Sequence, residues 1–424
     1  MTKRFETTHA SRSKTAPAGL TRRQFNAGLL GAAASAPLLG GVAQAQSDPV
    51  KIGIVLDKQG NNAVISQGLM RGTTIAFEQA KNTLLGRPIE YTWLDEPNPQ
   101  VGQQNMQKLI SENKVSLIMG GAISSTAMAM AATAKRTKVP TILNNAAAAE
   151  VTGKDCTRYS FRVPPTVEVQ VRAIAPYMAE IGKKWYSITP AYAFGQDALR
   201  CAKIVAKEQG ATIVGIDEVP GDTTDFSSYI LKIRAARPDV LFSSLVGNDL
   251  VNFLKQWNEL GMRDRAVIAG VAVSDTSFWD AGAANTVGIY AKPWHYTDPK
   301  NNAEEKRFIE AYRAKNNAPP SEKAWMGWFA AKSVLESVEA AKSLENVAIV
   351  TALEKWSYDD NGIKVHYRSW DHQMIRPIVI LRAKKSITDS HDFFDIISRY
   401  PEQQDQVEKL YGTQAEIGCN IGEL

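Results

Sequence analysis

The stretch that decides the fold runs from residue 115 to residue 126 and reads VSLIMGGAISST. It begins with a short apolar run, turns at two glycines and continues through three hydroxyl residues into an alanine-rich segment. The apolar run predicts a buried strand, and the alanine-rich segment predicts a helix. A strand that leads through a tight turn into a helix is the repeating unit of a parallel sheet.

The same alternation of short apolar runs and longer amphipathic runs continues through most of the chain. Strand-like runs occupy residues 51–56, 89–94, 115–119, 140–143, 184–189, 212–216, 240–243, 266–269 and 287–290. Helical patterns occupy residues 69–80, 100–112, 125–135, 167–181, 196–209, 227–236 and 249–260. This rhythm predicts an α/β fold with largely parallel sheets, whose continuous apolar strands are covered on both faces.

The strand–helix units fall into two series, which predicts two lobes. The first series ends near residue 165, and the second ends near residue 295. The remaining tail has only two strand-like runs, at residues 363–367 and 378–382. Because two strands are too few for a separate sheet, we expect the tail to complete the other two. The predicted division is an export signal at 1–45, a first lobe of 46–165 plus 296–368, and a second lobe of 166–295 plus 369–424.

The first 45 residues have the three parts of an export signal. Residues 22–25 (RRQF) precede an apolar stretch at 27–42, and residues 43–45 (AQA) form a cleavage site. The adjacent arginines resemble the twin-arginine type. The apolar stretch is too short to span a membrane. We therefore expect a mature chain in the periplasm, cleaved near Ala45 and without a membrane span.

The net charge of the chain is a property of that signal. The 424 residues include 49 Lys or Arg and 44 Asp or Glu, a formal charge of +5. Residues 1–45 hold six basic residues and one acidic residue, so the rest of the chain is neutral. A nucleic-acid-binding protein needs a basic excess to neutralise phosphates, and the sequence therefore argues against this class.

Residue patterns typical of catalysis, metal binding and cofactor binding are missing from the sequence. The four histidines after residue 45 are scattered, and no carboxylate or second histidine stands at zinc-ligand spacing. Neither a glycine-rich phosphate loop nor a nucleophile-elbow motif occurs. These absences disfavour an enzyme, and we expect no catalytic residues, no metal and no cofactor.

Three cysteines follow the signal, and in an oxidising compartment two of them can form a disulfide. The sequence alone does not fix which two. Cys201 lies in a helical pattern, which is typical of a small buried core residue. Cys156 and Cys419 lie in polar, loop-like surroundings and are the candidate pair.

Two segments place candidate ligand-binding residues at the carboxyl ends of strands, where ligands bind in open α/β sheets. Ser124, Ser125 and Thr126 stand at a helix start, where free backbone N–H groups and the helix dipole favour a carboxylate. The alternative is plain capping of the helix by one of the two serines. Tyr192 and Phe194 lie in a second strand-to-helix loop, where they would either contact a ligand or cover the helix start.

A third aromatic cluster lies at residues 291–296 (AKPWHY), between the second series and the tail. Trp294 is its candidate for ligand contact. A rigid crossover with buried aromatic side chains is the interpretation that the sequence favours slightly. Trp325 and Trp328 are three residues apart on a predicted helix, which indicates packing.

Taken in order, these segments resemble the leucine/isoleucine/valine-binding family of extracytoplasmic solute-binding proteins. The resemblance covers nearly the whole mature chain. It is carried by residues 52–55 (IGIV) with Gly60 and Gly72, by Ser124 with residues 139–140 (VP), by residues 191–195 (AYAFG) and by residues 238–247. The joint order and spacing of these motifs carry more weight than any one of them.

The resemblance implies the type I periplasmic binding fold. In this fold two Rossmann-like lobes with parallel sheets are joined by three crossovers, and the lobes close on a ligand held between them. The closed form, expected to be a monomer, delivers a small-molecule ligand to the membrane permease of an ABC importer. By resemblance, the residues expected at the ligand are Ser124, Ser125, Thr126, Ala146, Ala148, Ile65, Tyr192 and Phe194.

Two departures from the family pattern bear on the ligand. The loop at residues 144–148 (NNAAA) lacks the threonine that amino-acid binders tend to have. The loop at residues 270–274 (GVAVS) lacks an acidic partner for a ligand amine, and Asp275 comes too late. Since an unpaired buried ammonium is costly, we expect a small organic acid, aromatic in view of Tyr192, Phe194 and Trp294. The alternatives are a branched-chain amino acid, an amide or urea, and a receptor lobe that senses a ligand for a signalling system.

Overall fold

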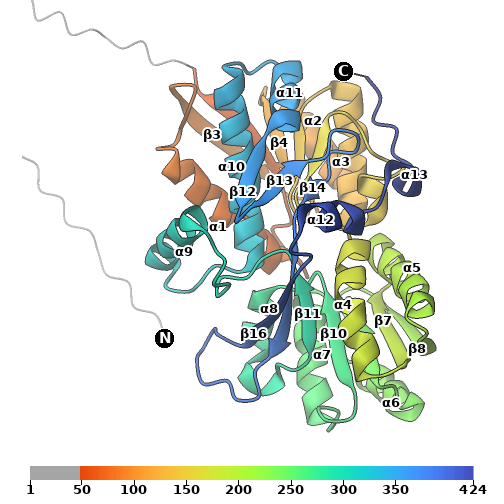
Figure 1. The fold of residues 1–424 in the computed structure, drawn as a ribbon. Helices are drawn as coiled ribbons and strands as arrows, with labels where there is room; N and C mark the ends of the chain where they lie inside the picture. Colours follow the sequence, from red (N-terminus) through yellow and green to blue (C-terminus); the bar gives the residue numbers. More distant parts are fainter. Residues whose placement is uncertain (1–47, 424) are drawn as a thin grey trace, which may run out of the picture. The chain divides into compact units, whose positions relative to one another are not determined.

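Residues 48–423 are described by the computed structural model, and their strands form two large sheets and one small sheet (Figure 1). The first large sheet has the strand order β2-β3-β1-β4-β5-β6. Its strands are β1 (Val50–Val55), β2 (Thr83–Leu84), β3 (Arg87–Leu94), β4 (Leu117–Gly120), β5 (Thr141–Leu143) and β6 (Ser160–Arg162). All neighbours run parallel except β2 and β3, so the carboxyl ends of β1, β4 and β5 meet at one edge.

Helices connect the parallel strands of this sheet. They are α1 (Ala63–Gln79), α2 (Pro99–Ser111) and α3 (Ser124–Thr137), and a 3₁₀ turn follows at Ala149–Val151. α2 packs against β1, β3 and α3. The helix α10 (Glu322–Ala341), far away in the sequence, packs along α1, with α11 (Asn346–Lys355) beside it. The strands β1, β4 and β5 are therefore buried between helices, as their continuous apolar runs predict, whereas β3 is partly exposed.

The second large sheet has the order β16-β15-β11-β10-β9-β7-β8. Its parallel strands are β7 (Lys184–Pro190), β8 (Thr212–Val219), β9 (Val240–Ser243), β10 (Val267–Val271) and β11 (Ile289–Lys292), and the two antiparallel ones are β15 (Ile378–Ala383) and β16 (Phe394–Tyr400). Its helices are α4 (Val167–Ile181), α5 (Ala193–Glu208), α6 (Ser227–Ala236), α7 (Gly247–Glu259) and α8 (Asp275–Ala281). A 3₁₀ turn follows α8 at Ala283–Asn285.

The tail is shared between the two sheets. α9 (Ala303–Asn316), α10 and α11 lie with the first sheet, and β12 (Ser357–Asp360), β13 (Ile363–Tyr367) and β14 (Met374–Ile375) form the small sheet (Figure 1). β15 and β16 then extend the second sheet. The last helices are α12 (Gln404–Leu410) and α13 (Gln414–Ile417). Beyond them, a disulfide joins Cys419 to Cys156 in the loop before β6, which is the pair that the sequence favours.

The predicted α/β fold with two largely parallel sheets is confirmed. The chain crosses between the sheets after β6, after β11 and after β14, and the C-terminal segment returns toward the first sheet after β16. The segment 369–424, assigned above to the second lobe, thus adds β14 to the small sheet and ends at the disulfide to Cys156. The bounds of the lobes stay a prediction. The export signal at residues 1–45 lies outside the described residues.

The sequence did not predict every element. The strand β6 has only three residues, Ser160–Arg162, of which two are polar, so no apolar run marks it. The seven-residue strand β16 reads FDIISRY, in which polar residues interrupt the apolar ones, so no long apolar run marks it. Both strands pair with buried neighbours, and these tertiary contacts override the weak local signal.

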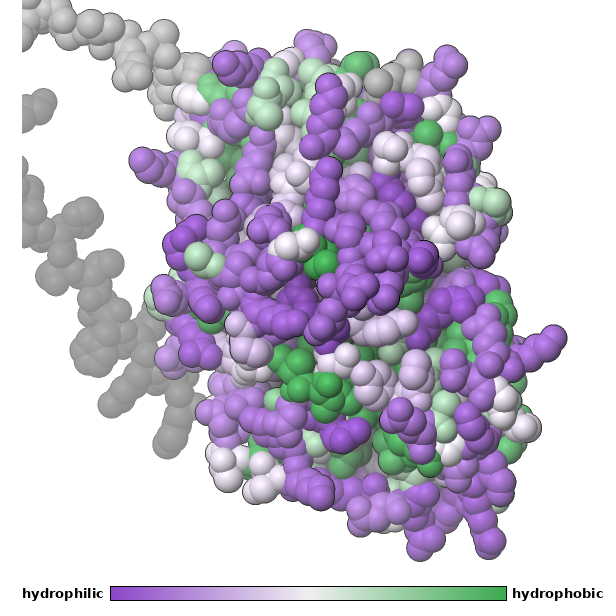
Figure 2. Space-filling model, viewed as in Figure 1, coloured by the Kyte–Doolittle hydropathy of each residue, from purple (hydrophilic) through white to green (hydrophobic). Residues whose placement is uncertain are grey.

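On the face drawn in Figure 2, hydrophilic side chains dominate, and hydrophobic ones gather in small patches, mainly over the elements of the second large sheet. Among the helices of residues 48–423, none combines the length and the apolarity that a membrane crossing requires.

Candidate ligand-binding site

A cavity lies where the carboxyl-end loops of the two large sheets meet. It has about 390 Å³ of empty space, part of which opens to solvent. From the first sheet and its helices, it is lined by Asn62, Ile65, Ala122, Ile123, Ser124, Asn145, Ala147 and Lys323. From the second sheet it is lined by Tyr192, Phe194, Val246 and Ala272. The cavity thus lies at the strand ends, where open α/β sheets bind their ligands.

Ser124, the first residue of α3, lines the cavity but does not cap its helix. The capping position is held by Ile123, which offers no side-chain hydrogen bond. Instead the Ser124 Oγ accepts hydrogen bonds from the backbone N–H groups of Ala147 (3.3 Å) and Ala148 (3.2 Å). These bonds occupy the acceptor capacity of the hydroxyl, so its proton is left to donate to a ligand acceptor.

The glycine turn before α3 already holds a carboxyl group of the protein. Glu96 follows β3, is fully buried, and its Oε1 accepts from the backbone N–H groups of Ala122 and Ile123 (3.2 Å). Burial raises the pKa of Glu96 well above its usual range, and the neighbouring charge of Asp57 raises it further. Two of the N–H groups that the sequence assigned to a ligand anion are therefore used by Glu96, a residue that the sequence analysis did not single out.

Asp57 is the second buried acid at this edge of the sheet, directly after β1. Burial raises the pKa of its carboxyl group to about 7, and the nearby charge of Asp95 adds to the effect, while a hydrogen bond with Asn62 opposes it. The folded chain thus binds a proton at Asp57 over a pH range in which the unfolded chain has lost it. Stability from this group is present below pH ~4 and is lost as the pH rises toward 7.

We expect Asp57→Asn to stabilise the protein at pH 8 by roughly 2 kcal/mol and to change the unfolding free energy little at pH 4, because an amide does not ionise. Urea unfolding of the mature chain at both pH values measures this. Asp405→Asn, at an exposed position of α12, is the control and should show no such dependence. An equal effect of Asp57→Asn at both pH values would contradict the assignment.

Apolar and aromatic side chains from both lobes line part of the cavity. Tyr192 and Phe194 lie at the start of α5 with ring centres 6.4 Å apart, tilted by 34°. Ile65 of α1 belongs to the same core cluster, and Val246 and Ala272 add small apolar surfaces from the second sheet. Together these side chains provide the contact area that an apolar or aromatic ligand body needs.

Lys323 is the residue that the sequence analysis missed. It is the second residue of α10, it lines the cavity, and it is only 5% exposed. Its Nζ donates to the carbonyl oxygen of Ala272 (3.4 Å) and lies 3.6 Å from the Glu322 Oε1. Burial lowers the pKa of Lys323, which the charge of Glu322 partly offsets. Among the described residues that line the cavity, Lys323 is the only charged one. The lining therefore offers a ligand one cation and no carboxylate.

A buried ionic cluster fixes the start of α10 against the second sheet. Lys292, at the end of β11, pairs with Asp275 and lies 3.3 Å from the Glu322 Oε2. The Asp275 backbone N–H also donates to Glu322 (3.1 Å). Asp275 is therefore committed to this cluster and does not line the cavity, as its late position in the sequence suggested. Because Glu322 directly precedes Lys323, the cluster also fixes the backbone that carries Lys323.

Four of the residues predicted to contact the ligand line the cavity: Ser124, Ile65, Tyr192 and Phe194. Five others do not: Ser125, Thr126, Ala146, Ala148 and Trp294. Thr126 is buried toward Gly102 of α2, and Ala147 takes the lining position between Ala146 and Ala148. Trp294 is buried and stacks on Trp325 with ring centres 5.9 Å apart, which is the packing interpretation of its cluster. The roles at a ligand stay predictions.

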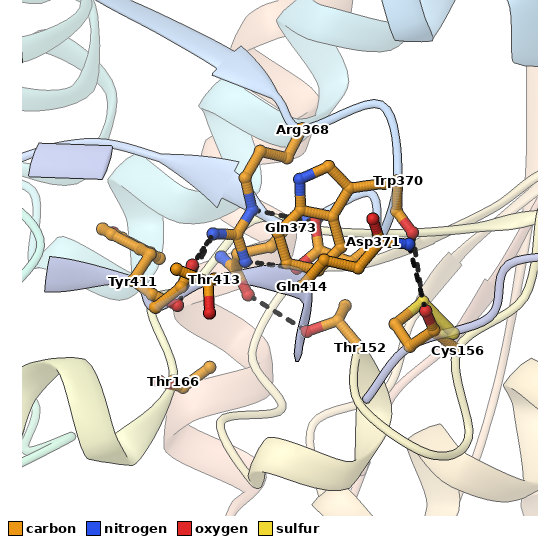
Figure 3. A network of polar contacts seen from close by, with 12 residues as sticks. Thr152, Cys156, Thr166, Arg368, Trp370, Asp371, Gln373, Tyr411, Thr413 and Gln414 are labelled. Atoms are coloured by element: carbon orange, nitrogen blue, oxygen red, sulfur yellow. Dashed lines mark hydrogen bonds and ion pairs between the residues drawn. A yellow bond between two sulfur atoms is a disulfide. The ribbon is translucent and has the colours of Figure 1, made fainter. Parts of the chain in front are cut away.

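The loop after β5 is supported from behind by a buried arginine. Arg162 of β6 donates to the Ala148 carbonyl oxygen, to the Thr152 hydroxyl and to the Gln373 Oε1 (2.6 Å). Figure 3 shows Gln373 and Thr152 in this network. The Ala148 backbone N–H donates to the Ser124 Oγ. By binding the Ala148 carbonyl oxygen, Arg162 therefore fixes the backbone segment that hydrogen-bonds the Ser124 hydroxyl.

The C-terminal segment belongs to the same network. Arg368 pairs with Asp371 and donates to the carbonyl oxygen of Gly412 (2.7 Å), while Tyr411 and the disulfide at Cys156 lie close by (Figure 3). The returning tail is thus attached both by hydrogen bonds and covalently.

Residues 48–423 contain no group of three or more His, Cys, Asp or Glu side chains placed to bind a metal ion.

Comparison with known proteins agrees with this architecture. The sequence model of the family described as "Periplasmic binding protein" matches residues 49–388. The chain belongs to the periplasmic binding protein family. Proteins of this family are solute-binding components of transporters, and membership implies a location outside the cytoplasm.

Individual members of the periplasmic binding protein family cover most of the chain. The "Leu/Ile/Val-binding protein homolog 4" of Brucella melitensis is 27% identical over 383 residues, 84% of this chain and 89% of that protein. An amino acid ABC transporter substrate-binding protein from Pseudomonas fluorescens has a TM-score of 0.78 at 24% identity, covering 88% of this chain and all of that one. A solute-binding protein from Rhodopseudomonas palustris, in complex with 3,4-dihydroxy benzoic acid, has a TM-score of 0.77 at 23% identity, covering 83% and 97%.

Proposed function

We propose that this periplasmic binding protein captures a small organic acid, such as an aromatic carboxylate, and delivers it to the permease of an ABC importer. The observation that carries the proposal is Lys323, a buried cation in a cavity whose lining has no acidic residue. A ligand carboxylate beside Lys323 and the Ser124 hydroxyl gains a charge-assisted hydrogen bond. An α-amino group in the same place would lie near a like charge with no acidic partner, which is costly.

The lining of the cavity favours an aromatic ligand body. Tyr192 and Phe194 line the cavity from the second lobe, and the ring of an aromatic ligand can stack or pack edge-on against them. Structural relatives bound to 3,4-dihydroxy benzoic acid and to benzoate support this choice. A branched-chain amino acid is the second candidate, because relatives carry that name.

The remaining parts of the proposal follow from the sequence. The signal at residues 1–45 directs the chain out of the cytoplasm by the twin-arginine route, with cleavage near Ala45. The mature protein acts as a monomer and not as an enzyme, and it needs neither a metal nor a cofactor.

A thermal-shift screen of residues 46–424 tests the ligand class. Aromatic acids, short aliphatic acids, branched-chain amino acids and amides are compared at equal concentration, since a ligand that binds only the folded state raises the melting temperature. We expect benzoate-type acids to give the largest shift. A strong shift with leucine or valine and none with organic acids would establish the second candidate instead.

Ser124→Ala tests the carboxylate contact. The variant should weaken binding of a carboxylate about tenfold, because it removes one hydrogen bond to a charged group and leaves two backbone N–H groups without their acceptor. Isothermal titration calorimetry with the acid that the screen identifies measures the change. Ser125→Ala, one residue further and not in the cavity lining, is the matched control and should bind normally. Equal affinities for all three proteins would remove Ser124 from the site.

A further inference from the structure

Asn61 bridges the two sides of the cavity. It lies in the loop between β1 and α1, on the side of the first sheet. Its Oδ1 accepts from the backbone N–H groups of Asn248 (2.7 Å) and Asp249 (3.2 Å), which form the first turn of α7 on the other side. Its Nδ2 donates to the Asp249 Oδ2 (3.3 Å). Three hydrogen bonds therefore join one side chain to a helix start of the opposite lobe.

α7 has no side-chain cap from its own lobe. The residue at its capping position is Val246, which has no side-chain acceptor. The first N–H groups of a helix need acceptors from outside the helix, and asparagine is among the side chains that supply them best. In this chain the cap comes from Asn61, 187 residues away from Asn248 in the sequence.

The first residue of α7, Gly247, lies against the backbone of Asn61. Gly247 has φ +58°, and a Cβ atom there would overlap the backbone carbonyl oxygen of Asn61. Both the positive φ and the lack of a side chain are needed for the two loops to meet. The residues next to this contact, Asn62 and Val246, line the cavity, so the contact lies at the cavity rim.

We propose that Asn61 holds the cleft closed by capping α7 across it. When the lobes separate, the two N–H groups of α7 lose their protein acceptor and the Asp249 carboxylate loses a donor. The closed state is favoured by the difference between these bonds and their replacements in water. Asn61 is therefore a positioning residue that sets the fraction of closed protein and the residence time of a ligand, without contacting the ligand.

The closed fraction of the ligand-free mature protein tests this proposal without any knowledge of the ligand. Donor and acceptor dyes are placed at Glu112 beside α2 and at Leu231 of α6, which are exposed and lie in different lobes. The buried free cysteine is removed by Cys201→Ala, so that only the introduced cysteines react. Single-molecule energy transfer then gives the populations of closed and open protein.

We expect Asn61→Ala to reduce the ratio of closed to open protein about fivefold, as the loss of a helix cap implies. Gly247→Ala should reduce it as well, because its methyl group pushes the Asn61 backbone away. The matched control is Asn98→Ala, which removes a cap from α2 within the first lobe, where Asn98 accepts from Val101 (2.9 Å). The control should leave the ratio unchanged.

An unchanged ratio in Asn61→Ala, or an equal change in Asn61→Ala and Asn98→Ala, would overturn the proposal. The same proteins can be followed with benzoate as the probe, where the dissociation rate should rise about fivefold in Asn61→Ala and stay constant in Asn98→Ala. If benzoate does not bind at all, benzoate is excluded as the ligand, and the populations of the ligand-free protein still decide the role of Asn61.

Discussion

Replacing Lys323 by methionine should weaken binding of an organic acid about 100-fold and leave the protein folded. Methionine has similar length and apolar volume, so it fills the same space beside Ala272 without the charge. A carboxylate that enters the cavity of this variant gives up water without meeting a cation, and the loss of one partner of a buried charge pair costs roughly 2–5 kcal/mol. Calorimetric titration with the acid found in the screen measures the difference.

The matched control for Lys323→Met is Lys332→Met on the same helix. Lys332 forms ion pairs with Glu304 (2.6 Å) and with Glu336, away from the cavity. Its replacement should leave affinity unchanged. Lys323→Met also removes a neighbour of Glu322, but Lys292 remains 3.3 Å from that carboxylate, so the fold should persist. Normal binding by Lys323→Met would contradict both the charge assignment and the organic-acid proposal.

The fold could be predicted from the sequence because its signals are local and repeated. The strand β9 and the helices α4 and α6 have the predicted bounds, since an apolar run or a helical period fixes each of them. β6 could not be predicted, because Ser160 and Arg162 are polar and the strand owes its place to pairing with β5. The short helix α8 was not predicted either, because its first residue, Asp275, is held by a tertiary ion pair with the buried Lys292.

The site was predictable in its position more than in its chemistry. Strand ends after β4 and β7 pointed to Ser124, Tyr192 and Phe194, and all three line the cavity. The burial of Lys323 was only weakly signalled, since a lysine in the first turn of a helix is usually exposed. Its burial arises from helix packing between segments far apart in the sequence. A lysine next to an apolar run with two tryptophans was the only available hint.

That packing depends on glycines in α1. A Cβ atom on Gly72 would overlap the carbonyl oxygen of Ala324, and one on Gly327 of α10 would overlap the carbonyl oxygen of Leu69. One turn before Gly72, a Cβ atom on Gly68 would come within 3.3 Å of the Lys323 Cβ. The two helices therefore approach so closely that their backbones touch, and this approach brings Lys323 to the edge of the cavity beside Ile65.

Gly72→Ala should therefore destabilise the protein by about 3 kcal/mol or more, because the added methyl group must push α10 away and disturb a packed core. Urea unfolding of the mature chain measures the loss. Gly221→Ala is the matched control, since a Cβ atom there meets nothing within 4 Å, and it should be nearly neutral. If the variant folds, displacement of α10 should also weaken binding of an organic acid. A stability equal to that of Gly221→Ala would show that the two helices do not need their close approach, and with it the position of Lys323 would lose its structural basis.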